Sequence, residues 1–304
     1  MGSMWIAAVV TQLVTLPAQT SLEAAAKHQN PVFTALVSRG VAFGDERLIP
    51  LPAPTLRDGL GDKDQQEAIA TIADLNHPVT QLMRPSIVAP FVLKIRKSPS
   101  SNPDRPARRV DVWFVAYGDL AMLGDDDFLR DLARQSEDRK GTKLPTEMVF
   151  LEETELRERS LVPTESATAR EVWFHSTFSL FDRVQLHVTR HAFVTRTSES
   201  ILVASLLDKR FTDDPDYPTA WNALRRDQLG RLQFGAKQPY QAAGFYLKDT
   251  RLHDPPEAIF VEYHQVFDEP RAWFDGANLL RSKLPLMVRD GVRKFRRKLR
   301  KASQ

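Results

Sequence analysis

The sequence predicts an α+β protein: a mostly antiparallel, sheet-rich body with a helical N-terminal lead and a basic amphipathic C-terminal helix. Three observations predict it. From about Ser86 onward, short runs of β-branched and aromatic residues are separated by turn residues, which is typical of strands. The connections between these runs are often too short for parallel crossovers, so antiparallel pairing is expected. The last 24 residues keep a helical period in which cations surround an apolar stripe.

The predicted strands follow the alternation of apolar and polar residues and the enrichment in valine, isoleucine and phenylalanine. They lie at Ile87–Arg96, Val110–Gly118, Met148–Leu151, Val172–Phe181, Val184–Thr195, Ile201–Leu207, Phe245–Lys248 and Ala258–Phe267. Helical periods predict helices at Gln65–Leu75, Asp125–Gln135, Glu155–Leu161 and Thr219–Leu229.

We expect three regions: residues 1–82 as an N-terminal apolar segment and helical lead, 83–280 as the sheet-rich body, and 281–304 as the basic helix. Thr20 and Glu23 resemble a capping box that opens a helix. The following stretch, residues 48–60, contains three prolines at alternate positions. Because proline cannot continue a helix, this stretch is predicted to run extended across a surface.

The first 18 residues contain an apolar run, WIAAVVTQLVTLPA from Trp5 to Ala18, whose length fits the core of an export signal. No lysine or arginine precedes it, so a buried N-terminal strand or helix is the favoured alternative. Cytoplasmic and exported locations both stay open. No apolar run approaches the ~20 residues of a membrane-spanning helix, which excludes an integral multispan protein.

The charge of the chain is strongly segregated. The net charge is +3, yet residues 281–304 hold ten Lys/Arg against one acid, Asp290, so this segment carries +9 and the remaining residues carry −6. Within it, Val288, Val292, Phe295 and Leu299 fall on one stripe. The cations spread over the rest of the circumference at Arg289, Arg293, Lys294, Arg296, Arg297, Lys298, Arg300 and Lys301. We expect these twelve residues to form a partner-binding site if the stripe is free.

An anionic membrane surface or an acidic protein is the favoured partner of this helix, since anionic groups attract such a row of cations. Nucleic acid is less favoured because few aromatic residues accompany the cations for base stacking. The third interpretation is structural: the stripe covers the core and the cations are solvated. Oligomeric state is not determined by any of these patterns.

Motifs for catalysis are weak. Glu262 and His264 project to the same side of a predicted strand and could form a base with an orienting carboxylate in a hydrolase-like site. No GxSxG turn or phosphate-binding loop accompanies them, and there is no cysteine for nucleophilic or thiolate chemistry. His187 and His191 would stand roughly 13 Å apart on a strand, too far for a shared metal. The sequence predicts no cofactor and no metal site.

The prediction for function is therefore a non-catalytic binding protein, attached peripherally to an anionic membrane surface or an acidic partner through its C-terminal helix. The alternatives are an enzyme with a Glu262/His264 site on the sheet, and a nucleic-acid-binding protein.

Overall fold

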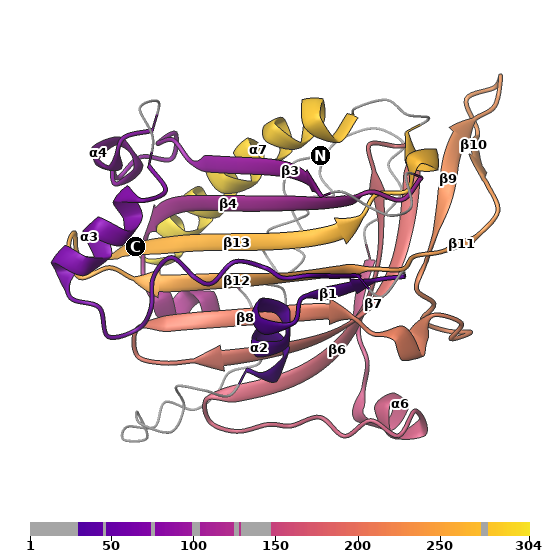
Figure 1. Ribbon diagram of the computed structural model, residues 1–304, viewed down its shortest axis with the longest axis horizontal. Helices are drawn as coiled ribbons and strands as arrows, with labels where there is room; N and C mark the ends of the chain where they lie inside the picture. Colours follow the sequence, from indigo (N-terminus) through magenta and orange to yellow (C-terminus); the bar gives the residue numbers. More distant parts are fainter. Residues whose placement is uncertain are drawn as a thin grey trace.

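The computed structural model describes residues 30–44, 47–73, 77–98, 104–124, 128, 147–274 and 279–304. Within these ranges an antiparallel sheet of eleven strands dominates the molecule (Figure 1). The C-terminal helix α7 (Leu279–Ala302) lies along one face, called here the inner face. The N-terminal segments, with α2 (Pro31–Ser38) and the β1–β2 hairpin, lie on the opposite, outer face. The predicted α+β class with a mostly antiparallel sheet is confirmed.

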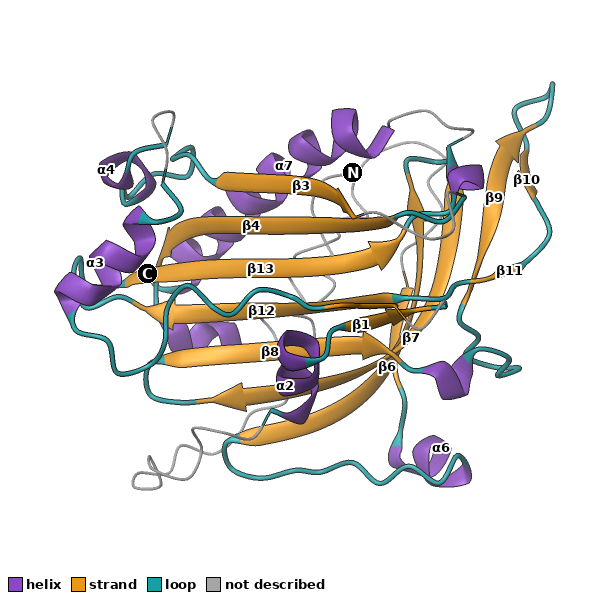
Figure 2. Cartoon of the chain, in the orientation of Figure 1, coloured by secondary structure: helices purple, strands orange, loops and turns teal. Residues whose placement is uncertain are grey.

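The sheet is built from strands that pair with antiparallel neighbours throughout (Figure 2). Its central order is β10-β9-β7-β8-β12-β13-β4-β3, and β6 with β5 continues from the other edge of β7. The strand bounds are β3 (Val92–Ser98), β4 (Ala107–Tyr117), β5 (Glu147–Phe150), β6 (Ala169–Leu180), β7 (Val184–Arg196), β8 (Ser200–Leu207), β9 (Ala220–Arg226), β10 (Leu232–Phe234), β11 (Gln238–Pro239), β12 (Ala243–Arg251) and β13 (Ala258–Asp268).

One predicted helix is wrong: residues 219–229 contain strand β9. The apolar residues Trp221 and Leu224 have a helical spacing, which is what suggested a helix. In the fold, β8 pairs with residues 190–196 of β7 and leaves residues 184–187 open on the same edge. β9 fills that open edge and pairs with β10 and β11 on its other side. Tertiary pairing therefore overrides the local helical period.

The N-terminal lead is helical from Pro31, as predicted. Asn30 caps α2 by accepting a hydrogen bond from the Phe33 amide (2.8 Å), and Val32 and Leu36 are buried against the outer face. The hairpin β1 (Val41–Phe43) and β2 (Arg47–Ile49) follows. The export-signal-like run and the capping box at Thr20 and Glu23 lie outside the described residues.

Residues 50–60 run extended over the outer face, as the prolines predict, and are called here the strap. The strap leads into the short helices α3 (Asp62–Ala70) and α4 (Val79–Leu82). Further short helices are α6 (Glu153–Glu158), η2 (Leu120–Gly124), η3 (Lys209–Phe211) and η4 (Arg271–Trp273). Of the predicted helix at 125–135, Phe128 alone is described, and it is buried.

Helix α7 begins six residues before the predicted proline start. Pro285 lies inside the helix, where it lacks the amide that would bond to the Arg281 carbonyl. Arg281 is exposed, so water satisfies this carbonyl at little cost. No helix in the described part of the chain is long and apolar enough to cross a bilayer.

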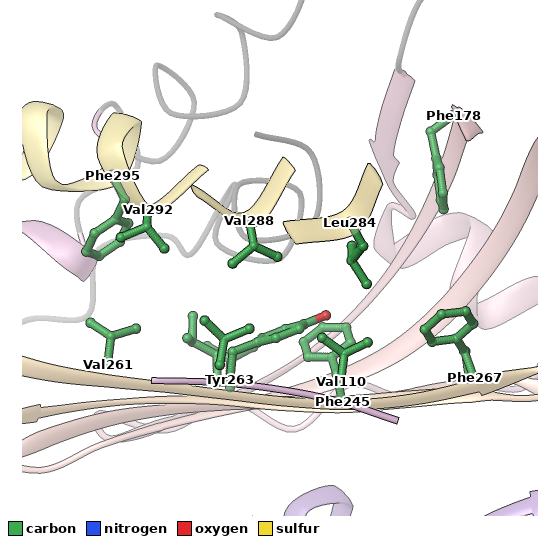
Figure 3. Close-up of a cluster of buried hydrophobic side chains, with 14 of the residues drawn as sticks. Val110, Phe178, Phe245, Val261, Tyr263, Phe267, Leu284, Val288, Val292 and Phe295 are labelled. Atoms are coloured by element: carbon green, nitrogen blue, oxygen red, sulfur yellow. The ribbon is translucent and has the colours of Figure 1, made fainter. Parts of the chain in front are cut away.

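The main core lies between α7 and the inner face. Figure 3 shows Val288, Val292 and Phe295 of α7 pointing toward the sheet, where Val110, Phe245, Val261, Tyr263 and Phe267 meet them. At the C-terminal end the approach is closest: a Cβ on Gly118 would lie 2.6 Å from Leu299 Cγ, and Gly118 has a φ of +155°. Only glycine fits this contact without displacing the helix.

Substitution of Phe295 by alanine is expected to lower the free energy of unfolding by about 3–5 kcal/mol, because its ring is fully buried and packs edge-on against Phe114 at 5.5 Å. Urea unfolding followed by circular dichroism measures this loss. Leu286→Ala, on the solvent side of the same helix and 47% exposed, is the matched control and should change stability by less than about 1 kcal/mol. Equal losses in both variants would contradict the docked position of α7.

Candidate functional site

The apolar stripe of α7, predicted as one half of a partner-binding site, is buried in the core. Val288 is 5% exposed, and Val292, Phe295 and Leu299 are 0% exposed. All four pack in the same cluster as the inner-face strands. An amphipathic helix whose apolar side already covers a sheet has no free apolar side for a bilayer. The stripe is therefore structural in this conformation.

The cations of α7 divide into two groups. Arg296 and Lys298 are buried, with 3% and 8% of their surface exposed. The Arg296 guanidinium donates hydrogen bonds to the carbonyls of Val115 (2.8 Å), Ala89 (2.5 Å) and Pro90 (3.0 Å). Burial lowers the pKa of Arg296 to about 10. Its guanidinium ties α7 to β4 and to the loop before β3.

The second group forms a row on the opposite side of the helix, called here the basic face: Arg289, Arg293, Arg297, Arg300 and Lys301. At 1.5 Å per residue, the four arginines extend over about 17 Å. Arg289 lies 3.5 Å from Asp290, its own neighbour in the helix. Among the described residues, Arg293, Arg297, Arg300 and Lys301 have no ion-pair partner. Lys294 lies half-buried at the border of the basic face.

The structure brings Glu262 and His264 together beneath the strap. His264 Nδ1 lies 2.8 Å from Asp111 Oδ1 of β4, and its Nε2 lies 3.5 Å from Glu262 Oε2. The three side chains are between 0% and 1% exposed. Burial disfavours the charged imidazole, but the hydrogen bond that Asp111 accepts from the ring and the charges of both carboxylates outweigh it and raise the pKa of His264. The imidazole is thus held between two carboxylates.

Asp111 is the carboxylate that sequence reasoning missed, because it lies 153 residues from His264 and no local motif links them. Arg109 Nε donates to Asp111 Oδ1 at 2.9 Å from two residues away. Burial acts to raise the pKa of Asp111, yet the bonds and charges of His264 and Arg109 together lower it. The two shifts have opposite directions, and both favour an ionised Asp111 beside a charged imidazole.

The strap covers this cluster and takes part in it. The Thr55 amide donates to Glu262 Oε2 (2.8 Å), and Trp113 Nε1 donates to Thr55 Oγ1 (3.1 Å). The Tyr246 hydroxyl donates to the Pro52 carbonyl (2.9 Å). Backbone groups of a proline-rich segment, which lack a ladder partner, are satisfied by these side chains.

A second polar contact holds the end of the strap. Lys248 Nζ donates to the Leu56 carbonyl and to Asp58 Oδ1, both at 2.8 Å. Asp58 also accepts from the hydroxyls of Thr197 (2.7 Å) and Ser200 (2.9 Å). Burial acts to raise the pKa of Asp58, but Lys248 and the two hydroxyls outweigh it and lower that pKa. The polar outer face thus serves as the docking surface of the strap.

This arrangement closes the Glu262/His264 pair to substrate. The pair has the carboxylate–imidazole geometry of a general base, but its exposed fraction is at most 1%, and the rings of Trp113 and Tyr246 pack against the imidazole. A general base must reach the proton that it abstracts. In this conformation the cluster holds the strap on the sheet.

The histidines of β7 lie on the outer face with separate partners. His187 Nδ1 lies 3.1 Å from the Thr177 hydroxyl, and His191 Nε2 lies 2.6 Å from Glu171 Oε1. Burial lowers the pKa of both imidazoles, and the charge of Lys237 adds to the effect at His187. Within the described residues no group of three potential metal ligands comes together.

Two buried charged residues on the inner face were also missed. Arg190 and Asp249 are 7% and 2% exposed. Burial raises the pKa of Asp249 to about 8. The sequence did contain a signal for both, because alternate residues of a strand share one face. Arg190 alternates in step with Leu186 and Val188, and Asp249 with Phe245 and Leu247. A charge in phase with apolar residues predicts a buried charge.

A scan against protein-family models and a search of curated proteins both found no match to this chain.

Replacement of His264 by glutamine is expected to lower the free energy of unfolding by about 3–5 kcal/mol at pH 6, because it leaves the buried Glu262 carboxylate without its cation and Asp111 with arginine partners alone. Since the folded pKa is raised above 6.5, the stabilisation by His264 is complete below pH 6.5 and is lost as pH rises through the folded pKa. The difference between wild type and variant in urea unfolding should therefore shrink at high pH. His191→Gln, at a site 23% exposed, is the control and should cost less than about 1 kcal/mol.

Replacement of Asp249 by asparagine tests the buried acid. The folded state keeps a proton that the unfolded state loses above pH 3.8, so Asp249 makes the protein less stable as pH rises from about 4 to about 8. The contribution is at most about 1.4 kcal/mol per pH unit. Thermal unfolding from pH 5 to 9 should show a flatter profile for the variant and a higher melting temperature at pH 9. Parallel profiles would refute a shifted pKa.

Proposed function

We propose that this chain is a non-catalytic binding protein that attaches peripherally to an anionic membrane surface through the basic face of α7. The observation that carries the proposal is the row of Arg289, Arg293, Arg297, Arg300 and Lys301 on the solvent side of a helix whose other side is fixed in the core. A rigid row of cations needs no folding step on binding, so little conformational entropy is lost.

Attachment of this kind depends on charge. The apolar stripe of α7 is occupied by the sheet, so each cation would contribute on the order of 1 kcal/mol near an anionic surface and less as salt rises. Leu286, which is 47% exposed, lies on the same side of α7 as the basic face, nearer the N-terminus of the helix. It would supply one apolar contact. A lipid surface uses both features, whereas an acidic protein partner would use the cations alone.

The two alternatives have weaker support. A nucleic-acid role draws on the same cations, but Phe295, the aromatic residue of α7, is buried and cannot stack on a base. An enzyme role at Glu262 and His264 requires the strap to leave, since both side chains are covered.

The test is flotation of the intact chain with liposomes. At low salt we expect binding to vesicles with anionic phosphatidylserine and little binding to pure phosphatidylcholine. Substitution of Arg293, Arg297 and Arg300 by glutamine should remove about 3 kcal/mol and lower the partition coefficient by about a hundredfold. Because these side chains are solvent-facing, thermal unfolding should change little.

The matched control is a triple glutamine variant at Arg39, Arg84 and Arg251, which are exposed and lie outside α7. It removes the same number of positive charges. It should bind anionic vesicles almost as well as the wild type. Equal binding to anionic and neutral vesicles, or an equal loss of vesicle binding in both triple variants, would contradict the membrane proposal. Binding to a polyglutamate matrix or to duplex DNA with no vesicle binding would favour the acidic-protein or nucleic-acid alternative.

A further inference from the structure

The inner face of the sheet contains a buried arginine that has no counterion among the residues that the structure describes. Arg190 of β7 is 7% exposed, and its guanidinium lies over the Phe245 ring at 5.4 Å. Its Nη1 atom has no hydrogen-bond partner. Neither an ion pair nor a hydrogen bond connects the side chain to any described residue. Burial lowers the pKa of Arg190, although the nearby hydroxyls of Tyr240 and Tyr263 oppose the shift.

Arg296 shows what a structural arginine looks like in the same protein. It is equally buried, yet its guanidinium donates to several backbone carbonyls and joins α7 to the sheet. Arg190 makes no such contacts. An unpaired buried charge costs several kcal/mol, so a protein keeps one where a partner arrives from outside.

Two further donors without partners flank Arg190. Ser176 of β6 and Ser205 of β8 are 4% and 0% exposed, and neither hydroxyl has a hydrogen-bond partner. The register pairs Arg190 with Phe174 and Leu207, which puts Ser176 and Ser205 at the diagonal positions on the same face. Diagonal neighbours lie ~7–8 Å apart between Cα atoms, close enough for the side chains to share one ligand.

The buried acids in the described part of the sheet have other positions or partners. Asp249 is the carboxylate of β12 on the inner face, but it lies four residues beyond Phe245, ~13 Å along the strand. Asp268 and Glu269 bond to Arg105 and Arg108, each at 2.5 Å. Asp111 and Glu262 lie on the outer face with His264.

From Phe245, which packs against Arg190, apolar side chains of the main core continue under α7. Gln265, directly opposite Phe245, borders a small apolar cavity lined by Val110, Val112, Tyr263, Phe267, Leu284 and Val288. Figure 3 shows Leu284 and Val288 facing Val110 and Tyr263 across this space. The cavity measures about 10 Å³, room for about one water molecule, so an entering chain would have to move α7 side chains outward.

We propose that the inner face around Arg190 binds an organic carboxylate with an apolar chain. The guanidinium pairs with the carboxylate, since its planar fork matches two carboxylate oxygens. Ser176 and Ser205 donate the remaining hydrogen bonds. The apolar chain of the ligand passes Phe245 toward the cavity beneath Leu284 and Val288. There it replaces the contacts that these two side chains make with the sheet. This site is independent of the basic face, which lies on the other side of α7.

The probe is octanoate, compared with octanol of the same chain length by isothermal titration calorimetry and thermal unfolding of the full chain. We expect octanoate to bind and raise the melting temperature, and octanol to bind at least tenfold more weakly. Arg190→Met should weaken octanoate binding by about thirtyfold, the equivalent of one charged hydrogen bond of about 2 kcal/mol. Without ligand, this variant should melt no lower than the wild type, because it removes an unpaired charge.

The control is Arg300→Met, which removes a cation from the basic face and should leave octanoate binding unchanged. Ser176→Ala with Ser205→Ala keeps the charge and should weaken octanoate binding several-fold, so it tests the site even where Arg190→Met does not fold. No binding of octanoate to the wild type at millimolar concentration, equal binding of octanol, or unchanged octanoate affinity in the serine variant would each overturn the proposal. Loss of octanoate binding in the Arg300 variant would assign the effect to the basic face and overturn it as well.

Discussion

The structure depends on the burial of α7 against the inner face of the sheet. Its apolar stripe supplies one wall of the main core, and the curved sheet supplies the other. Each buried aromatic or aliphatic side chain in this contact contributes about 1.5–3 kcal/mol of transfer free energy. Because that side of the helix packs in the core, the position of each cation around the helix decides its contacts. Arg296 bonds to backbone carbonyls, whereas Arg289, Arg297 and Arg300 are exposed and Arg293 is half-buried.

Buried polar groups have bonding partners on the outer face of the sheet, but Arg190 on the inner face lacks them among the described residues. On the outer face Glu262, His264, Asp111 and Lys248 satisfy each other and the backbone of the strap, so a buried ionic cluster gives the strap a defined path. On the inner face Arg190 has no counterion in the described part of the chain. Satisfied networks specify structure, and an unsatisfied charge is costly unless something binds to it. This contrast separates a structural cluster from a site.

Much of the fold could be predicted from local patterns. The eight predicted strands each overlap an observed strand, because alternation of apolar and polar residues reflects a sheet with two different faces. The prolines of residues 48–60 leave only an extended path. The helix prediction for residues 219–229 was wrong because pairing with the open edge of β7 favours a strand, although the local period favours a helix. The partners of Glu262 and Arg190 could not be predicted, since sheet register brings together residues that are far apart in sequence.

By itself, the sequence determined the α+β class, the antiparallel strands, the amphipathic helix and the concentration of positive charge in residues 281–304. These features follow from residue type and period, which act locally. Only the tertiary structure decided that Val292 and Phe295 are core residues and that Arg289, Arg297 and Arg300 are exposed. It also decided that His264 has two carboxylates, while Arg190 has none among the described residues. The reason is that burial and counterions are set by what lies opposite a side chain, and that is a property of chain packing.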